Sequence, residues 1–110
     1  MNISEMQKEA WKTSEEHGFH AGEHGVHVPT KLLLLIQEAT EAFDEVRDGG
    51  NLKTNTYKEN GKPEGFPSEI ADIVIRAGDL AEIIGFDLEE AVKEKMAFNR
   101  GRPFMHGRKM

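Results

Sequence analysis

Two pairs of carboxylates are the residues of this 110-residue chain whose type and spacing suggest chemistry. Glu38 and Glu41 are three positions apart, and Glu69 is followed by Asp72 at the same interval. Residues three apart on a helix share a face, so each pair would direct both carboxylates toward one place. If two adjacent helices brought the pairs together, the four carboxylates would repel one another unless a cation neutralised them. All-oxygen sites suit hard divalent ions, so the pattern suggests Mg²⁺, for which Mn²⁺ can substitute.

Other interpretations of these side chains have to be set beside the metal site. Acids on a helix flank are often solvated charges, and one Glu-x-x-Glu motif has little specificity by itself. A di-iron centre is disfavoured because helical di-iron proteins use Glu-x-x-His motifs, whereas Asp44 and Asp72 stand three residues beyond Glu41 and Glu69. The histidines of residues 17–27 alternate with glycines, which favours a loop over a rigid zinc site.

A second polar group lies near the end of the chain and consists of hydrogen-bond donors. Lys95 and Asn99 are four residues apart on one helix face, and Arg102 follows just beyond the helix. Such donors bind phosphate oxygens. The alternative is that Lys95 and Arg102 are solvated and that Asn99 only helps to end the helix.

The apolar residues recur at helical spacing in four segments, and no stretch shows the alternation of a strand. Prolines, glycines and capping residues mark the ends of these segments. Residues 50–66 have no period and are predicted to form a long loop. The pattern predicts an all-α four-helix bundle in one domain, residues 1–110. The predicted helices run over about residues 2–16, from an N-cap at Thr30 to Gly49-Gly50, from Pro67 to Gly85, and from an N-cap at Asp87 to Gly101.

The second helix is expected to pack by an apolar stripe. Leu33 and Leu34 fall outside that stripe, so the first two turns of the helix are apolar all round, as in a bundle centre or a subunit interface. We therefore expect a homo-oligomer, a homodimer or a dimer of dimers, that completes the bundle and buries both leucines. The stripe itself comprises Leu32, Leu35, Ile36, Ala39, Ala42, Phe43 and Val46.

The composition narrows the class of protein further. The chain has no cysteine, which excludes disulfides and thiolate metal sites. A net charge of −6 disfavours binding to a nucleic-acid polymer, although the segment from Lys95 onward is basic and includes Arg108 and Lys109. The longest apolar run, Leu32–Ile36, is too short to span a membrane, and the first residues lack the pattern of a signal peptide. We expect a soluble cytoplasmic protein with no membrane partner.

Several motifs in this order resemble the MazG-like all-α nucleoside triphosphate pyrophosphohydrolases. The resemblance extends from about residue 31 to residue 103, and its specificity comes from the order and spacing of the motifs rather than from any one of them. One departure is Gln37, which stands where that family often has a glutamate beside the residue equivalent to Glu38. The motifs are residues 34–42, Glu69-Ile70-Ala71-Asp72, residues 87–91, and Lys95-x-x-x-Asn99-x-x-Arg102-Pro103.

The resemblance implies a function. It implies Mg²⁺-dependent hydrolysis of (deoxy)nucleoside triphosphates at the α–β phosphate bond, giving a monophosphate and pyrophosphate, as in nucleotide-pool house-cleaning. The two carboxylate pairs would bind Mg²⁺, and Lys95 and Asn99 would contact the triphosphate, with Arg102 as a third donor. Either Glu38 or Glu41 would orient or deprotonate the attacking water. Two other hypotheses are a non-catalytic helical interaction module and a protein that senses metal or nucleotide without turnover.

Overall fold

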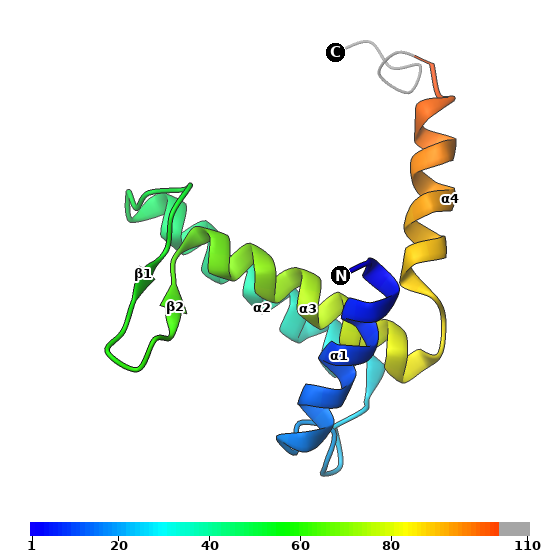
Figure 1. Ribbon diagram of the computed structural model, residues 1–110, viewed down its shortest axis with the longest axis horizontal. Coiled ribbons are helices and arrows are strands. Elements are labelled where there is room, and N and C mark those ends of the chain that lie inside the picture. The colour runs from blue at the N-terminus through cyan, green and yellow to red at the C-terminus, as the bar shows by residue number, and fades with distance from the viewer. Residues whose placement is uncertain (104–110) are drawn as a thin grey trace.

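Four helices make up most of the computed structural model, which describes residues 1–103 (Figure 1). This confirms the all-α class and the number of helices expected from the sequence. Arg108 and Lys109 of the basic terminal segment lie outside the described residues. In chain order the elements are α1 (Ile3–Glu16), α2 (Val28–Arg47), β1 (Thr56–Tyr57), β2 (Pro63–Glu64), α3 (Phe66–Ile84) and α4 (Leu88–Arg100).

The helix ends follow local chemistry, with one correction. Asp87 caps α4 as predicted, since its side chain accepts from the backbone N–H groups of Glu89 and Glu90. Gly85 ends α3 in the left-handed conformation, with φ 98°. The predicted N-cap of α2 at Thr30 is wrong: His27 is the N-cap. Proline is favoured in the first turn of a helix, and α2 already begins at Val28 with Pro29 in its first turn.

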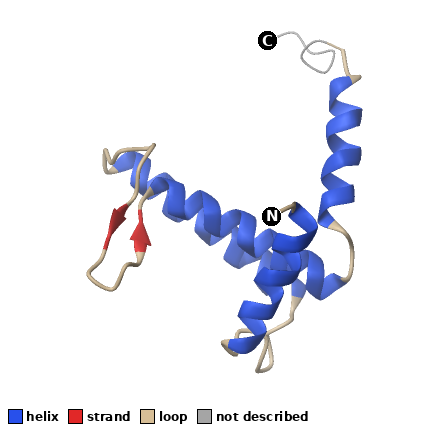
Figure 2. Cartoon of the chain, in the orientation of Figure 1, coloured by secondary structure: helices blue, strands red, loops and turns tan. Residues whose placement is uncertain are grey.

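The loop between α2 and α3 contains a small β-hairpin that the sequence pattern did not predict (Figure 2). Its strands are antiparallel, with Thr56 opposite Glu64 and Tyr57 opposite Pro63. Strands of two residues are too short to show a period in the sequence. The Asn55 side chain accepts from the backbone N–H of Ser68, which ties the hairpin to the start of α3.

Helix α3 is the centre of the fold, because α1 and α2 both pack along it (Figure 1). Helices α2 and α3 run antiparallel, and α1 crosses the second half of α3. The crossing is close at Gly78, where an added Cβ would lie 2.8 Å from Met6 Sδ and 3.3 Å from Gln7 Cα. The buried apolar residues are few and mostly small: Ala10, Ala42, Leu80 and Ala81.

Helix α4 extends away from the α2–α3 pair and contacts α1 (Figure 1). None of its residues is buried, and the side chains of Met96 and Phe98 are exposed. Its orientation is set at its first turn, where Gln7 Oε1 accepts from the backbone N–H of Leu88 and Glu89 Oε1 accepts from that of Ser4. Leu88 and Val92 at the start of its apolar face are half-buried, whereas Met96 further along is exposed.

Most of the apolar stripe of α2 lies outside the core of this chain, which is a second correction, and Ala42 is its one buried member. Leu32, Ile36 and Phe43 are 48%, 58% and 62% exposed. The buried residues of α2 are Lys31, Glu38 and Ala42, so α2 faces α3 by the flank that carries its carboxylates. The periodicity placed the stripe correctly on one face but could not reveal which element that face meets.

No helix within residues 1–103 combines the length and the apolar character needed to cross a bilayer.

Candidate metal centre

The contact between α2 and α3 gathers the predicted carboxylates. Glu38, Glu41 and Glu69 each offer one carboxylate oxygen, and these three atoms lie within 4.8 Å of one another. The spacing of three residues on each helix places the side chains on the facing flanks. The separation of the oxygens suits ligands of one cation.

Glu69 is the most perturbed of these acids. Burial, hydrogen bonding with Glu41 and the charges of Glu41 and Glu38 together raise the pKa of its carboxyl to about 7, and burial is the largest cause. Its Oε2 atom is buried and has no hydrogen-bond partner. A buried oxygen without a partner is costly, and a bound cation would satisfy it.

Asp72 lies one turn further along α3 and belongs to the same electrostatic cluster. Burial raises the pKa of its carboxyl, and the charge of Glu38 raises it further. The Arg76 guanidinium partly offsets these effects, while Glu41 adds a smaller increase and Lys62 a smaller decrease. Asp72 therefore experiences an excess of negative charge.

Arg76 of α3 is a direct partner of the acids. Its Nε atom donates to Glu38 Oε1 at 2.7 Å, and Glu38 is only 7% exposed. This contact neutralises one of the four carboxylates and fixes the rotamer of Glu38. Three carboxylates remain for a cation to balance.

The donor set fits a hard divalent cation. It consists of carboxylate oxygens from two helices. The unpartnered oxygen of Glu69 would be satisfied by coordinating a cation. Glu38, Glu41, Glu69 and Asp72 are the residues that would hold such an ion.

The predicted phosphate donors lie elsewhere in the single chain. Lys95, Asn99 and Arg102 are on or just beyond α4, which stands apart from α2 and α3 (Figure 1). The Lys95 Nζ and the Arg102 guanidinium lie 5.5 and 5.2 Å from the centre of the Phe98 ring, and Arg102 Nη1 is 3.5 Å from Asn99 Oδ1. The structure groups these three residues with one another but does not bring them to the acids.

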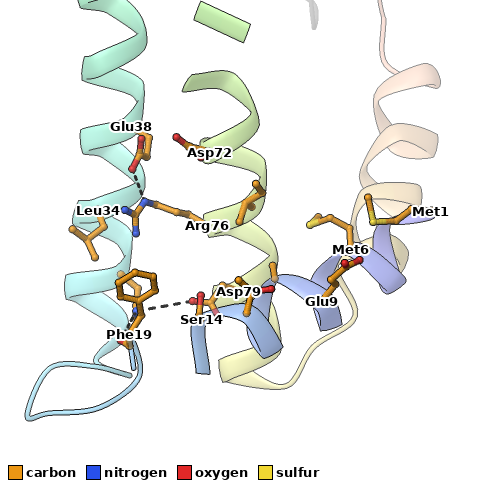
Figure 3. A pocket seen from close by; sticks show the side chains of 14 residues that line it. Met1, Met6, Glu9, Ser14, Phe19, Leu34, Glu38, Asp72, Arg76 and Asp79 are labelled. Carbon is orange, nitrogen blue, oxygen red and sulfur yellow. Dashed lines mark hydrogen bonds and ion pairs between the residues drawn. The ribbon is translucent and has the colours of Figure 1, made fainter. Parts of the chain in front are cut away.

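An open pocket of about 600 Å³ begins at the acids and is lined by residues of α1, α2 and α3. Glu38, Asp72 and Arg76 line one end, and Phe19, Asp79 and Ser14 lie toward the other (Figure 3). The position of the pocket makes it the natural place for a ligand that also reaches the cation.

The far end of the pocket contains further charged side chains from α2 and α3. Lys31 and Asp79 line it, and each side chain is 9% exposed. His20 bridges two carboxylates, with Nδ1 2.7 Å from Glu15 Oε2 and Nε2 2.8 Å from Asp79 Oδ1. A spacing of seven residues separates Lys31 from Glu38 and Asp72 from Asp79, which places each pair on one helix face and could have indicated the connection.

The fold and the site define a class: an all-α protein in which carboxylates from two packed helices converge beside an open pocket. A segment of 36 residues is 50% identical to a protein of Cyanophage S-2L named dATP/dGTP diphosphohydrolase. The segment is 33% of this chain and 34% of the phage protein, so the match spans about a third of that relative's length. No family model matches the chain, and no solved structure matches it. The short match gives weak support to the resemblance to nucleotide pyrophosphohydrolases.

Proposed function

We propose that this protein is a Mg²⁺-dependent pyrophosphohydrolase that converts nucleoside triphosphates to a monophosphate and pyrophosphate. The observation that carries the proposal is the carboxylate cluster with the buried, unpartnered oxygen of Glu69. The partial match to a protein named dATP/dGTP diphosphohydrolase supports a nucleotide substrate. The order of the motifs from residue 31 to residue 103 resembles that of the MazG-like pyrophosphohydrolases, which supports the same reaction.

The acids of the cluster would have different roles in the reaction. A divalent cation, when bound, would neutralise phosphate charge and lower the pKa of the attacking water. Glu38 is held by an arginine, Arg76, whereas Glu41 faces Glu69 and accepts a long 3.4 Å contact from the amide of Gln37, so no cation of the protein pairs with it in these contacts. Glu41 is therefore the carboxylate better placed to orient the water and accept its proton. The water oxygen bonds to the α-phosphorus, the bond to the bridging oxygen breaks, and pyrophosphate leaves.

The proposed active form is a homo-oligomer. Within residues 1–103 no large side chain is fully buried, and α2 and α3 each expose several large apolar residues. An interface that buried Leu33, Ile36 and Phe43 would contribute several kcal/mol per chain, on the order of 1.5–3 kcal/mol for each side chain. Such packing also provides a route for Lys95, Asn99 and Arg102 of one copy to reach the acids of another.

Product analysis tests the reaction. The protein is incubated with Mg²⁺ and a panel of deoxynucleoside triphosphates, and the products are separated by chromatography. We expect monophosphate and pyrophosphate, with label from heavy-oxygen water in the monophosphate because attack is at the α-phosphorus. Diphosphate and orthophosphate would contradict the proposal, and binding without any product would favour the sensing hypothesis.

Sedimentation tests the assembly. We expect a dimer or larger species at micromolar concentration, and Phe43→Asp should shift the protein toward monomer because it places a charge on the exposed apolar face. Lys12→Glu, at an exposed position of α1, serves as the control. A fully active 12.4 kDa monomer would overturn the proposed assembly.

A further inference from the structure

The pocket beside the acids is built differently at its two ends. The end at Glu38 and Asp72 is where phosphates would meet the cation. The far end, at Lys31 and Asp79, has polar groups of both signs (Figure 3). A ligand that filled the pocket would therefore have phosphate at one end and neutral groups that both donate and accept hydrogen bonds at the other.

Much of the remaining lining of the pocket is apolar, and Glu9 and Thr13 of α1 also line it. Met6 and Ala10 of α1, Leu34 of α2 and Ile75 of α3 line the pocket, and Phe19 closes its far side. Apolar walls with a few polar groups at fixed positions are typical of sites for flat, partly apolar ligands. A nucleobase has this character.

The far end has hydrogen-bonding capacity that the protein does not use. Asp79 Oδ1 is bonded by His20 Nε2, whereas Asp79 Oδ2 is 4.0 Å from Lys31 Nζ, too far for a direct hydrogen bond. The contact recorded for Lys31 Nζ as a donor is a long one, 3.4 Å to the carbonyl of Phe19. A charged acceptor and a charged donor thus lie side by side in a largely buried position, where such bonds are strong.

The distance between the ends matches a nucleotide. Asp72 and Asp79 are seven residues apart on α3, which corresponds to about 10.5 Å along the helix axis. A purine nucleotide bound with its α-phosphate at the acids spans a length of this order to the far edge of its base. A pyrimidine, with its single ring, reaches less far.

We infer that this pocket holds the base of the substrate and that Lys31 and Asp79 select a purine, with guanine preferred. Guanine has an O6 acceptor for Lys31 and, on the same edge, ring and amino N–H donors for Asp79. Adenine also has a donor and an acceptor but offers the carboxylate only its amino group. His20 is a positioning residue, because its bond to Asp79 Oδ1 fixes the carboxylate. The inference rests on the proposed function for its phosphate end.

Kinetics with four deoxynucleoside triphosphates test the base site. We expect kcat/KM for dGTP to exceed that for dCTP and dTTP by at least about 10-fold, with dATP between them. Asp79→Asn and Lys31→Met should each reduce the preference for dGTP about 10-fold, mainly through KM. The inhibition constant of inorganic triphosphate, which has no base, should stay unchanged. Lys12→Met is the matched control for Lys31→Met, because Lys12 is exposed and does not line the pocket.

A second variant covers the case in which Asp79→Asn fails to fold. Ile75→Trp should fill the pocket from a partly exposed position of α3. It should raise KM for all four nucleotides and leave the inhibition constant of inorganic triphosphate unchanged. The inference would be overturned if these variants lost activity toward all four substrates and inhibition by triphosphate to the same extent. A wild-type preference for pyrimidines would also overturn it.

Calorimetry with deoxyguanosine monophosphate in the absence of Mg²⁺ separates this inference from the proposed function. Binding that Ile75→Trp abolishes would support the base site even if no triphosphate were hydrolysed. Hydrolysis of triphosphates without base preference, and without binding of the monophosphate, would leave the proposed reaction standing and reject the base site.

Discussion

Two places on α3 bury polar side chains, and they do so in opposite ways. At the α1 crossing, Gln7 is 5% exposed and its amide is satisfied: Nε2 donates to Glu82 Oε1 at 2.9 Å and to the Phe86 carbonyl at 2.7 Å. Its Oε1 accepts from the backbone N–H of Leu88. At the α2 contact, the acids crowd together, and Glu69 Oε2 has no partner.

The difference separates a structural polar contact from a candidate functional one. An amide whose donor and acceptor atoms are all paired stabilises one packing arrangement without a ligand. Like charges that face one another oppose the packing until something of opposite charge arrives. The α1 crossing therefore should not depend on Mg²⁺, whereas the α2–α3 contact should.

The largest effect is expected from removing a charge at the acids. Glu41→Gln and Asp72→Asn should each lower turnover by at least about 100-fold, because each removes a ligand charge. The same variants should melt at a higher temperature than the wild type without metal, since repulsion falls, and should gain less from added Mg²⁺. Activity assays and thermal melts measure both.

The matched control is Glu16→Gln, an exposed acid at the end of α1. It should leave activity and the response to Mg²⁺ unchanged. Full activity in Glu41→Gln or Asp72→Asn would remove that residue from the proposed site.

A smaller effect, of opposite sign on stability, is expected at the α1 crossing. Gln7→Ala leaves the Leu88 N–H and the Phe86 carbonyl without their side-chain partner, and it should destabilise the protein by about 2–3 kcal/mol. Urea unfolding with and without Mg²⁺ measures the loss. We expect the same increment of stabilisation by Mg²⁺ as in the wild type; a changed increment would mean that the two places are coupled.

The smallest effect is a dependence of stability on pH in the metal-free protein. The pKa of Glu69 is about 7 in the folded chain against an ordinary value of 4.5, so between these values the folded state binds more protons than the unfolded state. The free energy of unfolding should therefore fall as pH rises from about 4.5 to about 7, and Asp72 acts in the same direction. The melting temperature should fall by a few degrees, on the order of 2–6 °C.

Thermal melts across this range test the pH effect. Glu69→Gln should flatten the dependence, and excess Mg²⁺ should reverse it because the cation favours the ionised acids. A wild-type curve that is flat, or that rises with pH without metal, would contradict the assigned burial of Glu69.

The helices could be predicted from the sequence because their signals are local. Asp87 and Gly85 act on the turn in which they stand, and the structure places both where the pattern did. The N-cap predicted at Thr30 was wrong because the helix already begins at Val28, with Pro29 in its first turn. The hairpin was missed because its strands are only two residues long.

The candidate site could be predicted only in part. The carboxylate spacing predicted that Glu38, Glu41, Glu69 and Asp72 share facing flanks, and the structure brings them together. Their role as metal ligands, and the roles of Lys95, Asn99 and Arg102, stay predictions. The pair of Lys31 and Asp79 was not predicted, because the two residues lie on different helices and the seven-residue spacings relate each of them to an acid and not to each other.

What the sequence determined by itself was thus the position of each helix and the face on which each carboxylate pair lies, since both depend on backbone geometry over a few residues. Only the tertiary structure decided which face of α2 meets α3. It turned the apolar face, with Leu32 and Ile36, outward and buried Glu38 instead. That choice depends on the sum of contacts along α3, and it is what gives Glu69 its buried, unpartnered oxygen and the acids their pocket.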